Sequence, residues 1–331
     1  ARSYMDLIKE TSNNFQDFFG LRDFYSLVKM ICFFVEQTSN QRSKSPTQLQ
    51  LVHCIKRNFG GLDTIDPVKT FALRLMSKVD WNAECFQGLE TDPYCSALGL
   101  IKTSLYKTDD MECDSRYLLL LTENYGALAI LQECFLTETK FITVFGSSFP
   151  SDQEYTQVCR NINRIKVCME TGKTVVLLNL ENLYESLYDA LNQHYVYFGG
   201  ERFVDLGLGT HRVKCRVHKN FRLIVIAEKC VVYERFPIAL INRLEKHLLT
   251  VNTILTGEQH DVAQKLLEWV ANFCREKPLP FRQQNETKKN PRSVEDVFIG
   301  YNADACYSVI LHVWRKFKDH NMILDEAKRL L

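Results

Sequence analysis

The string Gly172-Lys173-Thr174 has the residue types that end a phosphate-binding loop, in which backbone amides and a lysine hold phosphate oxygens. Such a loop needs a strand before it and a helix after it, so that the amides at the start of the helix face the anion. Here the string follows a predicted helix over residues 155–170 and precedes a predicted buried strand over 175–178. We therefore predict that Gly172 ends the helix and that the string binds no phosphate.

A loop with the correct order of elements follows the apolar run of residues 118–121. Aligned with the pattern GxxxxGK[ST], this loop has Thr122 and Ala127 in place of the two glycines. Leu128 replaces the lysine, and Ala129 replaces the hydroxyl residue. Without the lysine no cation reaches the phosphates, and without the hydroxyl no side chain holds Mg²⁺. We interpret the loop as part of a nucleotide site that has lost its chemistry.

The ends of two further predicted strands lack the polar residues that such chemistry needs. After residues 175–178 the sequence continues with Asn179 and Leu180, where an Asp-Glu pair would supply a magnesium ligand and a base that activates water. After the predicted strand over 223–226, Glu228 stands where a polar Asn would contact the terminal phosphate. The sequence therefore predicts no ATP hydrolysis at this site.

Two arginines have the surroundings of residues that act on a nucleotide. Arg243 follows Asn242 on a predicted helix led by Pro237, and this segment resembles the arginine-finger helix of AAA+ ATPases. Such an arginine acts on the nucleotide of a neighbouring module, so it stays useful when its own site is inactive. Arg22, on a predicted N-terminal helix, resembles the second-sensor arginine of an AAA+ lid. A solvated arginine on an amphipathic helix is the alternative for each, and both alternatives stay open at this point.

The composition excludes several other classes of protein. Lys and Arg total 41 and Asp and Glu total 40, and this balance argues against a dedicated nucleic-acid-binding protein. No run of about 18 apolar residues occurs, so no membrane span is expected. The twelve cysteines form no CxxC pair, which argues against the usual zinc-ligand spacing and is typical of reduced thiols in the cytosol or nucleus. The start, without Met or a signal-peptide pattern, is expected to be a cut from a longer protein.

The middle of the chain alternates short apolar runs with helical periodicity, which indicates a parallel sheet with helices on both faces. The predicted strands are residues 118–121, 141–145, 175–178 and 223–226, and the predicted helices are 127–135, 155–170 and 183–192. A hairpin-like insert is expected at 197–218. We therefore predict the α/β fold class, with a P-loop-like parallel sheet flanked by all-helical segments.

Helical periodicity fills most of the chain on either side of this sheet, with polar loops expected at 38–45 and 283–292. Residues 81–115 have poor periodicity and many turn formers, so they are expected to be a connecting segment. We divide the chain into a helical segment (1–80), the connecting segment (81–115), an α/β subdomain (116–250) and a second helical segment (251–331).

Long strings of the sequence resemble the mysterin family, very large cytosolic proteins with a dynein-like row of AAA+ modules and a RING-type E3 ubiquitin ligase region. The resemblance runs through nearly the whole chain, and its strongest parts are residues 18–27, 145–150, 152–157, 182–192, 205–218 and 242–247. It implies that residues 1–80 are the lid of one AAA+ module. Residues 116–250 would then be the next, degenerate module, and 251–331 the start of its own lid.

The resemblance also implies cofactors and partners. ATP with Mg²⁺ is expected at the neighbouring module and none at this one, and zinc only in a RING outside this chain. The expected partners are adjacent AAA+ modules of the same polypeptide and, through the full-length protein, the ubiquitin machinery. The implied location is cytoplasmic, with the lipid-droplet surface as a further place for the parent protein. Arg22 would belong to the preceding module, and Arg243 would act in trans on that module's nucleotide.

Other functions are weighed against this one. A pure scaffold that contacts no nucleotide is the main rival, and it differs in not needing charge at Arg22 or Arg243. A Cys-His hydrolase is disfavoured because no nucleophile lies on a recognisable elbow or helix N-terminus. Residues 212–218 place Arg, Lys, Arg and His on one face of a predicted strand. That face would hold a phosphate, an acidic peptide or nucleic acid, or would simply be solvated.

Overall fold

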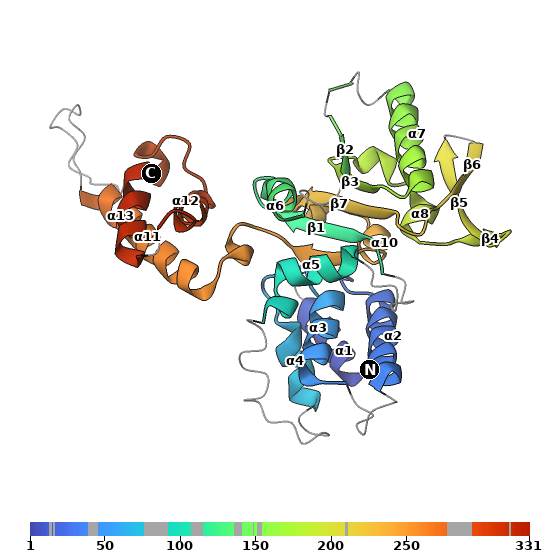
Figure 1. Ribbon diagram of the computed structural model, residues 1–331, viewed down its shortest axis with the longest axis horizontal. Coiled ribbons are helices and arrows are strands. Elements are labelled where there is room, and N and C mark those ends of the chain that lie inside the picture. Colours follow the sequence, from blue (N-terminus) through green and yellow to red (C-terminus); the bar gives the residue numbers. More distant parts are fainter. Residues whose placement is uncertain are drawn as a thin grey trace. The chain divides into compact units, whose positions relative to one another are not determined.

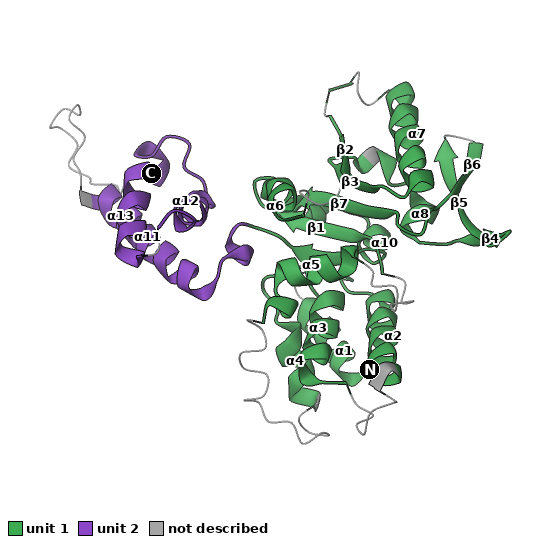
Figure 2. Ribbon diagram, in the orientation of Figure 1, with its two compact units in different colours: residues 1–250 green, residues 251–331 purple. Residues whose placement is uncertain are grey.

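The computed structural model describes residues 1–12, 15, 17–38, 46–75, 92–106, 115–135, 141–147, 149–150, 154–208, 211–276, 293–317 and 319–331. These residues form two compact units, 1–250 and 251–331, which are described separately (Figure 2). Apart from Thr38, the polar loops expected at 38–45 and 283–292 lie outside the described residues.

A five-stranded parallel sheet forms the centre of the first unit (Figure 1). Its strands are β1 (Leu118–Thr122), β2 (Phe141–Phe145), β3 (Thr174–Leu178), β7 (Arg222–Glu228) and β8 (Glu245–Leu248), in the spatial order β2-β3-β7-β1-β8. Helices α6 (Gly126–Phe135), α7 (Tyr155–Thr171) and α9 (Lys229–Arg235) pack against these strands. The predicted α/β fold with a parallel sheet is confirmed.

The central strands are apolar because neighbouring elements bury both of their faces. All five positions of β1 are buried, which explains the uninterrupted run Leu118–Leu121. Gly172 ends α7 in the left-handed conformation with φ 72°, and its N–H donates to the carbonyl oxygen of Cys168. The predicted role of Gly172 is therefore confirmed, and the string Gly172–Thr174 stands between a helix and a strand.

Four helices at the N-terminus belong to the same unit as the sheet. They are α1 (Arg2–Ser12), α2 (Leu21–Thr38), α3 (Gln48–Asn58) and α4 (Pro67–Leu75). A capping box between Thr47 and Gln50 starts α3. Helices α3 and α5 (Ala97–Leu105) pack against β8, so this bundle covers one edge of the sheet (Figure 1).

The described part of the predicted connecting segment 81–115 is mostly helical, although its periodicity in the sequence is poor. It contains η3 (Pro93–Cys95) and α5. The turn formers that weaken the periodicity have defined roles here. The side chain of Ser96 caps α5 by accepting from the N–H of Gly99, and a Cβ at Gly99 would lie only 2.0 Å from the carbonyl oxygen of Pro93.

Two predicted helices take a different form. Residues 183–192 contain the end of η5 (Glu181–Leu183), a turn, and the one-turn helix α8 (Tyr188–Leu191). The prediction that the helix led by Pro237 continues through residues 242–247 is also wrong. Helix α10 (Ile238–Ile241) ends before Asn242, and β8 follows. Buried ion pairs with α2 and α3 satisfy the charged residues of β8, so this strand has no apolar run that sequence analysis could detect.

The predicted insert is a three-stranded antiparallel sheet of β4 (Val196–Phe198), β5 (Glu201–Leu208) and β6 (His211–Arg216). Its basic side chains are partly neutralised within the unit. Arg212 pairs with Asp189 at 3.2 Å, and Arg216 with Glu201 at 3.7 Å. β6 ends before His218, so the predicted row of four basic positions is shorter than expected.

The second unit contains the helices α11 (Gly257–Glu276), α12 (Ala305–Trp314) and α13 (His320–Leu330), with the short helices η6 (Asn252–Ile254) and η7 (Val294–Asp296). Its core is separate from that of the first unit. Within the described ranges, no helix has the length and apolar character that a bilayer crossing requires. The division into lid and module segments at residues 80, 115 and 250 stays a prediction.

His53 on α3 is a buried histidine whose protonation affects stability. Its Nδ1 lies 3.1 Å from the carbonyl oxygen of Tyr94, and its ring stacks on Tyr94 with centroids 3.9 Å apart. Burial, with a contribution from the charge of Arg57, lowers the pKa of His53 to about 4. Below about pH 6.5 the His53 imidazole binds a proton in the unfolded chain but stays neutral in the native chain. The free energy of unfolding therefore decreases as the pH falls.

The His53 contribution to the free energy of unfolding is expected to fall by roughly 2–3 kcal/mol between pH 7 and 4.5. Amide exchange of the β1 peptide at the two pH values measures this for the first unit alone. His53→Gln should lose most of this pH dependence, whereas His211→Gln, at an exposed position, should keep it. Equal pH dependence in the His53 variant and the parent would contradict the assignment.

Candidate functional site

The loop after β1 spans residues 123–125, and α6 begins directly after it. Thr122 is fully buried, and its Oγ1 accepts a hydrogen bond of 2.9 Å from the N–H of Ala127. The N–H of Tyr125 donates to Oε1 of Glu228 at 2.7 Å. Amides that would face a phosphate in an active loop therefore bind side chains of this chain.

The remaining positions of the predicted degenerate site carry no group for phosphate or metal chemistry. Leu128 and Ala129 stand in the first turn of α6, the first half-buried and the second exposed. Asn179 is exposed and left-handed, with φ 55°. Leu180 is buried in the apolar core. No cation, hydroxyl or carboxylate occupies these four positions, as their residue types require.

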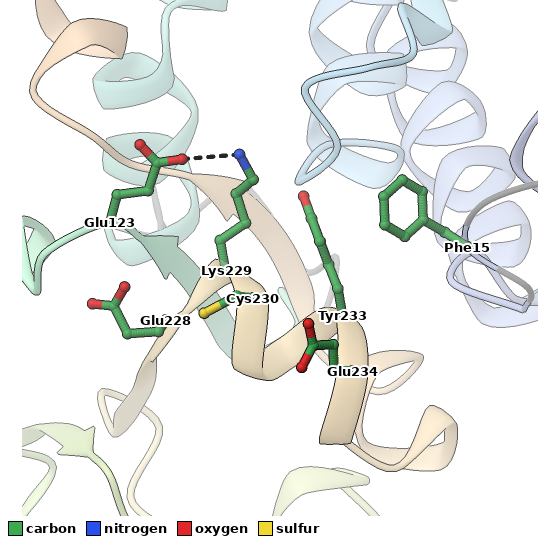
Figure 3. A pocket seen from close by; sticks show the side chains of 7 residues that line it. All are labelled: Phe15, Glu123, Glu228, Lys229, Cys230, Tyr233 and Glu234. Carbon is green, nitrogen blue, oxygen red and sulfur yellow. Dashed lines mark hydrogen bonds and ion pairs between the residues drawn. The ribbon is translucent and has the colours of Figure 1, made fainter. Parts of the chain in front are cut away.

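A cavity of about 490 Å³ opens beside the β1 loop (Figure 3), and its lining residues are Phe15, Glu123, Glu228, Lys229, Cys230, Tyr233 and Glu234. Lys229 donates to Asp63 at 2.6 Å and to Glu123 at 2.9 Å. These bonds outweigh the effect of burial and raise the pKa of Lys229. Since three carboxylates and one paired lysine line the cavity, its electrostatics disfavour a polyphosphate.

Arg243 lies at the other end of the sheet from the β1 loop. It comes just before β8, and Glu245 of β8 pairs in register with Leu118 at the start of β1. The loop follows Thr122 at the end of β1. At about 3.3 Å per residue, the strand separates these two ends by roughly 13 Å. Arg243 is therefore positioned to act elsewhere than at the loop of its own sheet.

The guanidinium of Arg243 is a largely buried cation. The residue is 9% exposed, and its Cζ lies 3.6 Å from the centroid of the Tyr188 ring. Its Nε has no hydrogen-bond partner among the described residues, and Asp189 is paired with Arg212 instead. Burial lowers the pKa of Arg243, and the nearby positive charge of Arg22 acts in the same direction. The environment of this group therefore favours an additional anion.

The short helix α8 and the residue after it contact both predicted arginines. Tyr188 at its start stacks against Arg243, and Asn192 accepts a hydrogen bond of 2.6 Å from Nη1 of Arg22. Residues four apart on a helix lie on the same face. The structure thus brings together Arg22 and Arg243, which lie far apart in the sequence, and Arg22 remains exposed.

A buried ionic network fixes the segments that carry these arginines. Asp23 is fully buried and receives hydrogen bonds from Nζ of Lys246 at 2.9 and 3.0 Å and from Nη1 of Arg116 at 2.5 Å. It also accepts from the N–H of Gly20 at 2.9 Å. Burial lowers the pKa of Lys246 to about 8. The start of α2 is therefore held directly against β8, next to Asn242, whose Cγ would lie 2.8 Å from a Cβ at Gly20.

Sequence reasoning missed the residues that position the two arginines. Tyr188 and Asn192 are four residues apart in a segment predicted to be helical, and this spacing was the available signal. Lys246 and Arg116 gave no local signal, because their partner Asp23 lies far away in the sequence. Among the described residues, no group of three or more His, Cys, Asp or Glu is arranged to hold a metal ion.

Comparison with known proteins identifies relatives of this chain. Residues 108–255 match the family model described as the RNF213 AAA domain. The chain is 46% identical over 346 residues to the E3 ubiquitin-protein ligase RNF213 of Homo sapiens, covering 100% of this chain and 6% of that protein. It is 52% identical over 301 residues to the Mus musculus protein of the same name, covering 89% and 6%. The E3 ubiquitin-protein ligase rnf213-beta of Danio rerio is 44% identical over 342 residues, covering 100% and 6%. The chain thus spans about 6% of the length of these curated relatives.

Proposed function

The chain belongs to the RNF213 family and contains its AAA domain, and on this premise we propose that it is a catalytically inactive AAA+ module that completes the nucleotide site of the preceding module. The observation that carries this proposal is that the segment 188–192 contacts both Arg22 and Arg243 at the end of the sheet away from the β1 loop. ATP turnover of full-length protein with altered Arg243 is the experiment that tests it.

Two guanidinium groups that contact the same short segment, 188–192, are suited to a phosphate ligand. An arginine stays charged near neutral pH and donates two parallel hydrogen bonds to phosphate oxygens. Here Arg22 is exposed, whereas Arg243 is held against Tyr188. For Arg243 to reach an incoming phosphate it must leave the ring, which costs about 0.5–2 kcal/mol. Contact with a polyanion in a site that excludes water more than offsets this cost.

The inactivity of the module's own site is supported by the residues around the β1 loop. Leu128 offers no charge to a β- or γ-phosphate, and Ala129 offers no oxygen to Mg²⁺. Asn179 and Leu180 provide neither an anionic metal ligand nor a base. ATP with Mg²⁺ is therefore proposed for the neighbouring module only.

The 331-residue chain alone is expected to hydrolyse no ATP above the buffer background. Phosphate release measured at millimolar ATP and Mg²⁺ checks this. The matched control is the same preparation with Thr122, Leu128 and Ala129 changed to Gly, Lys and Ser, which should hydrolyse no faster because residues 179 and 180 still lack the metal ligand and the base. Steady phosphate release by the parent chain above the buffer background would contradict the proposed inactivity.

At the level of the full-length protein we propose the activity that the relatives' names state, an E3 ubiquitin-protein ligase. The ligase chemistry, its zinc ions and the contacts with ubiquitin enzymes would then lie outside this chain. The partners of this chain are the adjacent AAA+ modules of the same polypeptide. A cytoplasmic location, including the surface of lipid droplets, belongs to the same proposal.

A pure scaffold is the second candidate, and the burial of Arg243 favours it. A residue that is 9% exposed and stacked on Tyr188 stabilises the fold without contacting any ligand. The two functions differ in what they require of the charge. A scaffold needs the flat shape of the side chain, whereas completion of a nucleotide site needs the bidentate cation.

A further inference from the structure

We infer that the β1 loop has kept an anion-binding site whose ligand is the carboxylate of Glu228 from the same chain. The inference rests on the proposed inactivity and extends it. The loop lacks catalytic groups, and in addition the Glu228 carboxylate occupies the position where a phosphate would bind. The ligand class that would replace the carboxylate is an inorganic polyphosphate.

The first line of evidence is the geometry of the bond. Oε1 of Glu228 accepts a hydrogen bond of 2.7 Å from the N–H of Tyr125, a length typical of a charged acceptor. Tyr125 immediately precedes α6, which is ten residues long, so the partial positive charge of the helix start adds to the attraction. The carboxylate thus binds where the order strand, loop and helix presents an amide to an anion.

The second line of evidence is that Glu228 could have bonded elsewhere. It is the last residue of β7 and stands at the N-cap position of α9, where a carboxylate normally accepts from the next turn. Its side chain makes no such cap hydrogen bond. In register it lies opposite Thr122, the last residue of β1, and Thr122 turns its own hydroxyl to the N–H of Ala127. Side chains at the ends of the neighbouring strands β1 and β7 therefore both accept hydrogen bonds from N–H groups at the start of α6 and the loop before it.

The third line of evidence is the strained backbone that these bonds hold. Asn124 and Tyr125 have φ values of 52° and 55°, both in the left-handed region. Asn tolerates this conformation, but for Tyr it is unusual and costs free energy. A loop in this conformation needs a stabilising partner for the amide that it turns outward. In this chain the partner is Glu228, so the loop keeps the same shape without any ligand from solution.

The test is binding of inorganic tripolyphosphate, measured by calorimetry on the chain with Arg22→Ala and Arg243→Ala, so that the two arginines proposed to contact phosphate add no second site. This chain is the parent for the variants below. The parent chain should show no binding. Glu228→Ala frees the amide of Tyr125 and should bind tripolyphosphate with a dissociation constant at least tenfold below the weakest one that calorimetry detects. Glu234→Ala is the matched control, because it removes a carboxylate from the same cavity lining without freeing the amide, and it should bind no tripolyphosphate. Glu228→Gln removes the negative charge but keeps an oxygen that accepts from the N–H of Tyr125. If the hydrogen bond rather than charge repulsion excludes phosphate, this variant should bind no tripolyphosphate.

Amide exchange of the peptide that contains Tyr125 gives a second readout, which does not depend on the ligand. Exchange should be slow in the parent and in Glu228→Gln and at least tenfold faster in Glu228→Ala. If Glu228→Ala exchanges no faster and binds no tripolyphosphate, the inference is wrong, while the inactivity of the module stands. If Glu228→Gln and Glu234→Ala bind as tightly as Glu228→Ala, repulsion alone keeps the loop empty and the inference also fails. If the parent chain itself binds tripolyphosphate, the inference fails, while the inactivity, which rests on the missing catalytic groups, stands.

Discussion

Replacing Arg243 with alanine is expected to lower ATP turnover of the full-length protein by about 10³-fold or more, which corresponds to roughly 4 kcal/mol of transition-state stabilisation. The reason is that a guanidinium supplied across a module interface neutralises charge that develops on the phosphoryl oxygens. Arg243→Lys should recover little, since an ammonium lacks the planar fork that binds two oxygens. Steady-state phosphate release under saturating ATP measures the effect.

The control for this experiment is Arg212→Ala, which removes an exposed arginine that is paired with Asp189. It should leave turnover within about twofold, because Arg212 is not proposed to contact any nucleotide, and the loss of an exposed ion pair costs at most about 1 kcal/mol of stability. In the isolated chain, Arg243→Ala should cost only the contact with Tyr188, about 1 kcal/mol of stability. Parental turnover in both Arg243 variants would identify the module as a scaffold.

The sheet could be predicted where its strands are buried on both faces. The run Leu118–Leu121 is typical of a strand buried on both faces, and the β3 and β7 segments are similarly apolar. β8 could not be predicted, because its residues Glu245, Lys246 and His247 are polar and their burial depends on partners from α2 and α3. A pattern of apolar residues in the sequence indicates a buried strand only when that strand's own residues are apolar. The polar residues of β8 are buried with ion-pair partners that lie about 190 to 220 positions away.

Much the same distinction applies to the site. The missing lysine, hydroxyl and carboxylates around the β1 loop are visible in the sequence, because a motif fixes their spacing. The bond from Tyr125 to Glu228 is not, since it joins two strand ends whose neighbourhood depends on the strand order. Similarly, Arg22 and Arg243 were each predicted as site residues from their own segment, but the contact of both with residues 188–192 depends on how α2 packs beside β8.

Replacing Lys246 with methionine is expected to destabilise the first unit by about 3–5 kcal/mol, because it leaves the buried carboxylate of Asp23 with only part of its compensating charge. Glu245 beside it shows how strongly such partners act. Burial alone would raise the pKa of Glu245, but Arg57 and His247 outweigh it and lower the pKa to about 2. The opening free energy from amide exchange of the β1 peptide measures the loss without a contribution from residues 251–331.

Lys229→Met is the matched control, because it removes the same group from ion pairs with Asp63 and Glu123 that solvent reaches. It should cost about 1 kcal/mol or less. Adding Asp23→Asn to Lys246→Met should cost less than the sum of the two single changes, since the unpaired buried charge disappears. If Lys246→Met cost no more than the control, Arg116 alone would suffice to hold Asp23. The start of α2 would then be positioned without Lys246, by Arg116 and by the bond from Arg22 to Asn192.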